Sequence, residues 1–429
     1  MRAARRCLAV YLLASLTLPA MAADPLFGAD SLTAQRLVDV VLARNPGLEA
    51  LRAGVAEAAS RAEPAGALAD PMLAYTVAPQ TIGGGERLNQ DIQLSQEIPW
   101  PGTLELRENI ARIEAVTANQ DLDDLRLRII AAVKAAYAEW YYVHRALAIN
   151  EANRELLIEL RNVAETQYAA GRATQQDVIQ AEVEHDTLLD EALGLERERH
   201  SIQAQINGLL NRAPGAFLPP PGEVAPRASP PSLQALRRIA VKNHPELQRL
   251  EAQRQASRLR VGLAEKDFYP DFRFNAGYNS FREDQEQRFS VGASINIPLN
   301  RGKYRALKDA AQADALQAQW RLADRRAQLL AELASARAAV AESVAVIELY
   351  QDRLVPLAQD NLAAAVADYR AAAGDFLDVI TAENRKLMTE LTLARARADY
   401  VRRVAELERW TGGTTPKEPA TYGAGDVNE

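Results

Sequence analysis

Two segments in the second half of the chain alternate strictly between apolar and polar positions. In residues 272–280 the even positions up to Tyr278 are apolar or aromatic, and in residues 289–297 the odd positions are apolar. A period of two predicts β-strands with one apolar face and one polar face. The polar residues 281–288 between them predict the connecting loop of a hairpin.

A similar pair of segments lies near the start of the chain. Residues 72–77 and 90–98 alternate, and a Gly-rich stretch within residues 79–88 joins them. About nine to eleven residues is the length of a tilted strand that crosses a bilayer. Because an open sheet edge is not tolerated in lipid, two arrangements are open. Either the hairpins pack on helices, or several chains combine their strands.

Almost everything else predicts long, Ala-rich helix. The first helix covers residues 31–68 with a break near Asn45-Pro46, and a helical pattern without a breaker covers residues 103–170. At 1.5 Å per residue the latter spans roughly 100 Å. Gly171 ends it, and another helix covers residues 174–211. The fold expected is therefore mainly α with two β-hairpins.

The second half of the chain repeats the first. Ile98-Pro99 returns as Ile297-Pro298, 199 positions later, and the nine-residue spacing from Tyr168 to Asp177 returns from Tyr369 to Asp378. Residues 213–231 hold seven prolines and predict an extended connector between the repeats. The expected segments are a signal peptide 1–22, a first repeat 23–212 with hairpin 72–98, the connector 213–231, a second repeat 232–411 with hairpin 272–297, long helix 303–371 and helix 375–410, and a flexible tail 412–429.

The first 22 residues have the pattern of a secretory signal peptide. Three arginines precede an apolar run, and Ala20-Met21-Ala22 follows as a cleavage site. A short membrane anchor is the alternative. The only cysteine, Cys7, lies upstream of this site, so we expect a mature chain without disulfides or a lipid-acceptor thiol.

Composition and motifs argue against nucleic-acid binding, catalysis and metal binding by this chain. The formal net charge is −7 and becomes about −10 without the three signal arginines, and no basic block is present, so nucleic acid is not an expected partner. We expect no enzyme activity, no cofactor and no metal site, because no catalytic motif or phosphate-binding glycine loop occurs. The four histidines lack metal-ligand spacing and are expected on helix surfaces: His144, His185, His200 and His244.

The sequence resembles the TolC-like outer membrane efflux proteins. The resemblance rests on Ile98-Pro99-Trp100-Pro101-Gly102 before a long helix, on the duplicated Tyr-x8-Asp-Val-Ile-x-Ala-Glu element and on Val355-Pro356-Leu357, and it covers about residues 31–411. It implies a homotrimer in which four strands per chain form one twelve-stranded outer-membrane β-barrel. It also implies a coiled-coil-like helical tunnel through the periplasm. The short length, the missing lipid-acceptor cysteine and Trp100-Pro101-Gly102 look most like members that serve heavy-metal efflux.

The resemblance also implies two functional turns, at residues 171–177 and 372–378. The residues expected to contact a periplasmic adaptor (membrane fusion protein) are Gly171, Arg172, Ala372 and Gly374. The residues expected at the periplasmic aperture are Tyr168, Asp177, Tyr369, Asp375 and Asp378. Asp375 could instead cap a helix, and the tyrosines could simply pack between hairpins. Because Ala372 replaces the expected glycine, the left-handed residue of the second turn is expected to move towards Gly374.

The resemblance thus implies a passive exit duct, expected in the outer membrane of a Gram-negative cell, in contact with outer-membrane lipid and extending into the periplasm. An inner-membrane pump of the resistance–nodulation–division (RND) class would supply the energy through the adaptor. Heavy-metal cations are the expected cargo. A duct for organic compounds and a periplasmic coiled-coil scaffold or adaptor are the alternatives. A kink is also expected at Pro356, inside the second long helix.

Overall fold

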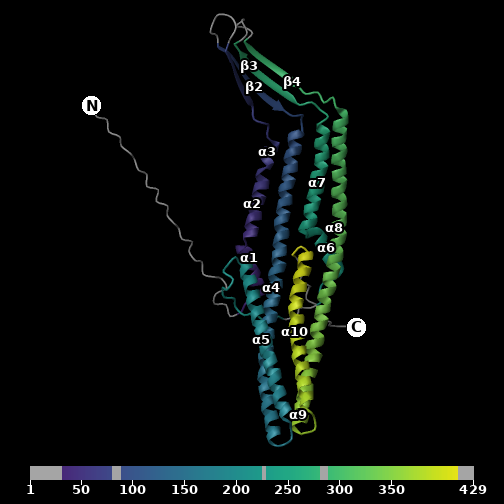
Figure 1. The fold of residues 1–429 in the computed structure, drawn as a ribbon. Helices are drawn as coiled ribbons and strands as arrows, with labels where there is room; N and C mark the ends of the chain where they lie inside the picture. The colour runs from purple at the N-terminus through teal and green to yellow at the C-terminus, as the bar shows by residue number, and fades with distance from the viewer. Residues whose placement is uncertain (1–30, 80–87, 225–228, 281–287, 414–429) are drawn as a thin grey trace, which may run out of the picture.

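The computed structural model describes residues 31–79, 88–224, 229–280 and 288–413. The molecule is long and narrow, with the strands at one end and two helix turns at the other (Figure 1). The elements of the first half are α1 Ala34–Arg44, α2 Pro46–Ser60, α3 Ala62–Gly66, β1 Met72–Pro79, β2 Leu88–Ile98, α4 Thr103–Ala169 and α5 Gln175–Leu209. Those of the second half are α6 Leu233–Asn243, α7 Pro245–Lys266, β3 Phe272–Asn279, β4 Phe289–Ile295, α8 Arg301–Leu349, the π-helix η2 Tyr350–Leu354, α9 Val355–Arg370 and α10 Phe376–Trp410.

The two hairpins join into one antiparallel sheet with the strand order β1-β2-β3-β4. The register aligns apolar residues of all four strands in rows on one face of the sheet. In one such row Tyr75 pairs with Ile92, Ile92 with Tyr278, and Tyr278 with Phe289. Polar rows lie between the apolar rows on the opposite face. The predicted mainly helical fold with four strands is confirmed.

No helix of the described chain covers the apolar face of this sheet. Val291, in the middle of β4, is 90% exposed, and Leu73, Leu94 and Phe274 are also exposed. Each outer strand, β1 and β4, has one strand neighbour within the described residues. A single copy therefore leaves a broad apolar surface and two open edges.

Helix α4 is the central element of the helical part. It packs against α1, α2, α7 and α10 along its length and forms a hairpin with α5. Figure 1 shows α7 and α10 stacked end to end beside α4, with α8 on their far side. Each helix therefore has lateral neighbours, as in a wall one helix thick. Among the described residues, no helix is both long and apolar enough to cross a membrane.

The proline-rich connector is fixed to α4 by side-chain hydrogen bonds. The indole of Trp140 donates to the carbonyl of Pro219 at 3.0 Å, and the hydroxyl of Tyr137 donates to the carbonyl of Leu32 at 3.0 Å. The backbone N–H of Leu32 in turn donates to Pro220 at 2.8 Å. The connector is thus held across the middle of the molecule.

The second long helix, expected over residues 303–371, extends from Arg301 to Arg370 and contains a π-helical turn. It divides into α8, η2 and α9. The backbone N–H of Val355 donates to the carbonyl of Tyr350, five residues earlier, and Pro356 follows without an N–H to donate. The first repeat has Glu155 at the matching place, and α4 is uninterrupted there. The two repeats therefore differ at this level.

Aromatic side chains gather where the sheet meets the helices. Trp100 stacks on Tyr269 with ring centroids 4.7 Å apart and on Phe272 at 5.8 Å, and Phe268 lies 5.9 Å from Tyr304. The backbone N–H of Trp100 donates to Asp271 at 2.9 Å. These contacts tie the end of β2 to the start of β3.

Candidate functional site

The two helix turns that carry the predicted site residues lie together at the end of the molecule far from the sheet (Figure 1). One turn joins α4 to α5, and the other joins α9 to α10. The side-chain amide of Gln167 donates to the carbonyl of Arg370 at 2.8 Å and links them directly. The structure therefore brings two segments about 200 residues apart in the sequence into one tip.

Both turns end their helices in the same way. Gly171 has φ 70°, its N–H donates to Tyr168 at 2.9 Å, and the next N–H, of Arg172, donates to Gln167. In the second turn Ala372 has φ 56° and its N–H donates to Tyr369 at 3.0 Å. The left-handed residue therefore stays at the equivalent position, although an alanine there costs about 1 kcal/mol or more.

The expected shift of the left-handed residue towards Gly374 is wrong. Gly374 does not have a positive φ, and its role is close packing. A Cβ atom added to Gly374 would lie 3.2 Å from the Cβ of Asp368, a tight approach. Glycine is favoured at position 374 because a larger side chain would crowd Asp368.

Tyr369 connects the two hairpins through a buried hydrogen bond. Its hydroxyl donates to the carboxylate of Asp177 at 2.9 Å, and its side chain is only 5% exposed. Burial raises the pKa of Tyr369, and the neighbouring Asp177 raises it further. The other oxygen of Asp177 accepts from the hydroxyl of Thr174 at 2.6 Å. By contrast Tyr168, the repeat counterpart, is 49% exposed.

The other predicted tip residues are exposed. Asp375 occupies the N-cap position of α10, but its carboxylate makes no capping hydrogen bond, so the capping interpretation fails for its side chain. Asp378 lies in the first turn of α10, and Arg172 lies in the first tip turn. Val379 is fully buried. Asp375 and Asp378 are therefore exposed carboxylates at the second turn, beside the exposed Asp368 and Arg370 at the end of α9.

The interior of the tip is an apolar cluster between the two hairpins. Its buried members come from α4, α5, α9 and α10, and they include Leu157, Leu160, Ala181, Leu188, Leu362, Tyr369, Phe376, Val379, Ile380 and Leu387. Within it lies one acid that the sequence analysis did not single out, Glu383, which is 1% exposed. Helical periodicity could have found this residue, because Glu383 lies four residues from both Val379 and Leu387 on the buried face of α10.

Two histidines depart from the expected surface positions. His244 is buried, stacks on Trp410 with centroids 6.3 Å apart, and has its pKa lowered by burial. His144 lies 4.3 Å from the ring of Trp140, and burial lowers its pKa too. Both pack against tryptophan because the imidazole ring fills space in a helix interface. In the described part of the chain no group of three or more His, Cys, Asp or Glu side chains could hold a metal ion.

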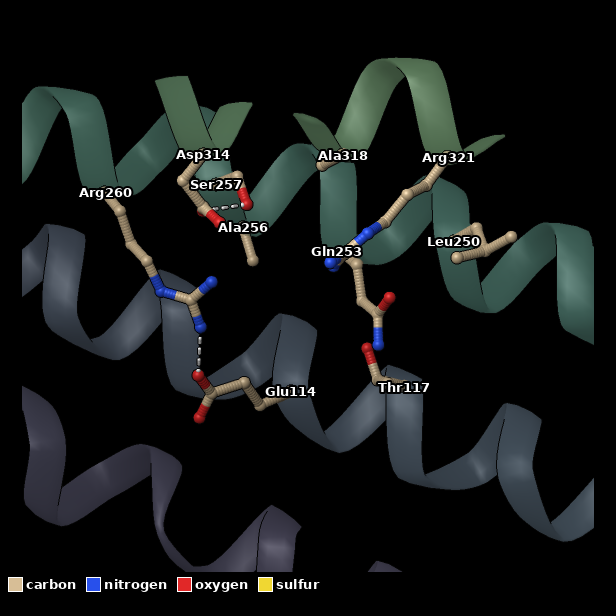
Figure 2. A pocket seen from close by; sticks show the side chains of 10 residues that line it. All are labelled: Glu114, Thr117, Leu250, Gln253, Ala256, Ser257, Arg260, Asp314, Ala318 and Arg321. Carbon is tan, nitrogen blue, oxygen red and sulfur yellow. Dashed lines mark hydrogen bonds and ion pairs between the residues drawn. The ribbon is translucent and has the colours of Figure 1, made fainter. Parts of the chain in front are cut away.

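A polar cavity of about 280 Å³ lies between α4, α7 and α8 (Figure 2). The guanidinium of Arg260 pairs with Glu114 at 2.7 Å, and the hydroxyl of Ser257 donates to Asp314 at 2.7 Å. Figure 2 also shows Gln253 pointing towards α4. Both carboxylates of the cavity are thus already bonded to side chains of its wall, and they stabilise contacts between helices.

Comparison with known proteins agrees with this architecture. The family model described as outer membrane efflux protein matches residues 236–413. The outer-membrane channel OprN has a TM-score of 0.75 at 20% identity, over 89% of this chain and 90% of that one. CusC, described for transmembrane channel formation, has a TM-score of 0.77 at 18% identity, over 92% and 96%. The outer membrane protein VceC of Vibrio cholerae has a TM-score of 0.75 at 19% identity, over 89% and 97%.

The sequence relatives match a smaller part of the chain. Nodulation protein T of Rhizobium leguminosarum bv. trifolii is 23% identical over 310 residues, which are 69% of this chain and 65% of that protein. The solvent efflux pump outer membrane protein SrpC of Pseudomonas putida is 23% identical over 248 residues, 53% of this chain and 51% of its own length. The chain thus spans between half and about two thirds of these relatives.

A chain of long helical hairpins with a four-stranded sheet at one end has the fold of the outer-membrane channel proteins. The match of residues 236–413 to the family model of outer membrane efflux proteins agrees with this fold. The resemblance to TolC-like proteins is confirmed.

Proposed function

We propose that the protein is the outer-membrane exit duct of an efflux system. In this proposal three copies combine their strands into one twelve-stranded barrel, and their helices form a tunnel into the periplasm. Cargo passes through without being chemically changed. An inner-membrane RND-type pump supplies the energy, and a periplasmic adaptor joins the pump to the duct.

The observation that carries this proposal is the two-faced sheet. One face is apolar and exposed, as at Val291, and the other is polar, as at its neighbour Ser290. A membrane barrel wall needs lipid-facing apolar side chains alternating with polar side chains that face the lumen. Pairing β4 of one copy with β1 of the next also removes both open edges.

The tip supports the proposal at the opposite end. The adaptor-contact residues are proposed as Gly171, Arg172, Ala372 and Gly374, which lie in the two turns linked by Gln167. The aperture residues are proposed as Tyr168, Asp177, Tyr369, Asp375 and Asp378. Within this set the Tyr369–Asp177 hydrogen bond holds the α9–α10 hairpin against the α4–α5 hairpin, so it acts as a latch on the aperture.

For the cargo we propose heavy-metal cations. The chain is acidic, and the exposed carboxylates Asp375 and Asp378 become rings of three charges in a trimer. Rings of carboxylates favour the entry of cations into a narrow pore. Asp177 contributes less to such a ring, because its carboxylate already accepts two hydrogen bonds.

Organic compounds are the second candidate cargo. The observation in their favour is the naming of two relatives, one for solvent efflux and one for toluene efflux. Acidic entrances also attract organic cations, so charge alone does not separate the two candidates.

Fractionation of cells and growth of a deletion strain test the proposal. An exit duct sediments with outer membranes and resists extraction by salt, whereas a periplasmic scaffold or adaptor is released. The deletion strain is then grown on zinc, cobalt, cadmium and copper salts beside dyes and antibiotics. Sensitivity confined to the organic compounds removes the metal proposal and leaves the duct. A protein found in the soluble periplasmic fraction removes the duct itself.

A further inference from the structure

Glu383 is a carboxylic acid buried in the apolar cluster of the tip. It lies on α10, one helical turn from both Val379 and Leu387, which are buried members of that cluster. Its side chain is 1% exposed. Burying an ionised carboxylate is costly unless it is paired and hydrogen-bonded, so the surroundings of Glu383 decide its charge.

The groups around Glu383 stabilise an ionised carboxylate poorly. Oxygen Oε1 of Glu383 is buried and has no hydrogen-bond partner among the described residues. The pKa of Glu383 is raised to about 7 by its burial first, with Lys386 lowering it and three acids also raising it: Glu184, Glu191 and Glu390. The neutral acid is therefore favoured over a much wider pH range than for an exposed glutamate.

The cation that lowers the pKa of Glu383 among the described residues, Lys386, is shared with other partners. The Nζ atom of Lys386 lies 3.0 Å from the side-chain oxygen of Asn153 on α4 and 3.4 Å from Glu390 on α10. From α9, Gln359 donates to Glu390 at 3.3 Å. Helix α5 presents the acids Glu184 and Glu191. Only Lys386 among these groups favours the ionised form of Glu383.

The chain contains a counterpart of Glu383 in a different environment. Glu182 follows Asp177 by five residues, as Glu383 follows Asp378. Its side chain is 56% exposed and lies 3.8 Å from the guanidinium of Arg161. The same sequence element thus places one glutamate in solvent beside a cation and the other inside the tip.

We infer that Glu383 is a proton-binding site that couples the pH of the periplasm to the packing of α10 against α4 and α5. The neutral acid is compatible with the packed tip, and the carboxylate favours separation of the hairpins, in which water reaches it. This inference rests on the proposed function only in placing the tip in the periplasm at the mouth of the duct.

The direction of the effect follows from proton linkage. A carboxyl group whose pKa is higher in the packed tip than in the opened one binds its proton more tightly when packed. Lowering the pH therefore stabilises the packed tip, and raising it from about 4.5 through about 7 removes this contribution. At pH 5 about 1% of such a group is ionised and at pH 8 about 90%.

Spin-label distances in the purified full-length protein test the inference. Labels on cysteines introduced at Val183 of α5 and Met388 of α10, both exposed, report the separation of the hairpins at pH 5 and pH 8. We expect a longer or broader distance at pH 8, with a midpoint near pH 7. Glu383→Gln, a neutral isostere, abolishes the change and stays packed at both pH values, whereas the matched control Glu182→Gln responds like the unmodified chain.

An infrared pH titration measures the proton itself. A protonated-carboxyl band that disappears between pH 5 and pH 8 is expected, absent from Glu383→Gln and kept in Glu182→Gln. Absence of this band, or a distance without pH dependence in the unmodified chain, overturns the inference even if Glu383→Gln fails to fold. Planar-bilayer conductance is measured in parallel. A protein that conducts at no pH contradicts the duct, while the distances and the band still decide the role of Glu383.

Discussion

The hydroxyl of Tyr369 and the carboxylate of Asp177 form a 2.9 Å hydrogen bond across 192 positions of sequence. The tyrosine comes from the second repeat and the aspartate from the first. Nothing in the local sequence of either residue requires this contact, which arises only because the two helix hairpins meet at the tip. It links the two hairpins directly, as does the hydrogen bond from Gln167 to the carbonyl of Arg370.

Removal of this hydrogen bond is expected to loosen the tip. Tyr369→Phe keeps the ring that packs 5.2 Å from Phe376 and deletes only the donor. The loss is about 1–3 kcal/mol, since the acceptor is charged. We expect increased entry of a large antibiotic that is otherwise excluded by the outer membrane, and a higher resting conductance. Tyr168→Phe, at the exposed counterpart, is the control, and an equal leak in both variants would remove the proposed latch.

The left-handed turn positions should respond in opposite directions to substitution. Gly171→Val forces a β-branched residue to φ 70° and should destabilise the turn by about 1–2 kcal/mol. Ala372→Gly relieves strain at φ 56° and should be neutral or stabilising by up to about 1 kcal/mol. Thermal unfolding measures both, and Gly194→Ala inside α5 is the control, with open space around the new methyl group.

In cells, Gly171→Val should reduce efflux while trimer formation and membrane insertion persist. The reason is that the substitution changes the tip that is proposed to contact the adaptor, and leaves the sheet untouched. Survival on the cargo compounds and the amount of trimer in outer membranes are measured together. Resistance equal to that of the unmodified chain would argue against the adaptor contact.

The two faces of the sheet can be compared with one substitution each. Val291→Lys places a charge on the apolar face, which should cost about 2–4 kcal/mol if it lies near the middle of the bilayer. Ser290→Lys, one residue earlier, places the same charge on the polar face and should be tolerated. The quantity of trimer in outer membranes reports the difference. Equal amounts of the two variants would contradict a lipid-facing apolar surface.

The loops within residues 79–88 and 281–288 are expected outside the cell, because their sequences are polar or Gly-rich and the strand ends that they join lie on the side of the sheet away from the helices (Figure 1). Their central residues, Gly84 and Gln285, lie outside the described residues. Cysteines at these two positions should react with a membrane-impermeant reagent on intact cells. A cysteine at Arg172, in the tip, should react only after the outer membrane is permeabilised, and the reverse pattern would invert the topology.

Trimer formation has its own measurement. Because β1 and β4 each have one strand neighbour within the described residues, the folded protein in detergent is expected to have the mass of three chains. Light scattering with correction for bound detergent determines this mass. A folded monomer would leave both edges open and would contradict the proposed barrel.

The strands could be predicted from the sequence because alternation is a local property. Every apolar position of residues 272–280 and 289–297 needs only its two neighbours to show the period of two. The pairing of β2 with β3 could not be predicted this way, since residues such as Ile92 and Tyr278 are brought together by the helices between them. Local patterns specify elements, and the long-range register depends on the whole chain.

The tip shows where local rules are overridden. The preference for glycine at a left-handed position is worth about 1 kcal/mol, and the contacts around the second turn, including those of Tyr369 and Gln167, exceed it at Ala372. Glu383, by contrast, has the spacing of the buried face of α10, because Val379 and Leu387 lie four residues on either side of it.

The π-helix η2 bears on the history of the duplication. The repeats are offset by 199 positions at Ile98 and Ile297 but by 201 at Tyr168 and Tyr369, so the second long segment has gained two residues, or the first has lost two. In a π turn each hydrogen bond reaches five residues back instead of four, so the turn holds an extra residue. The α-helix on either side can then continue with its faces less rotated than after an insertion into a purely α-helical segment. We therefore expect that η2 absorbed at least part of the length change, which would keep the second tip aligned with the first. The length of a helix in such a duplicated chain can therefore change during evolution while the packing surfaces of the tip at the end of that helix stay the same.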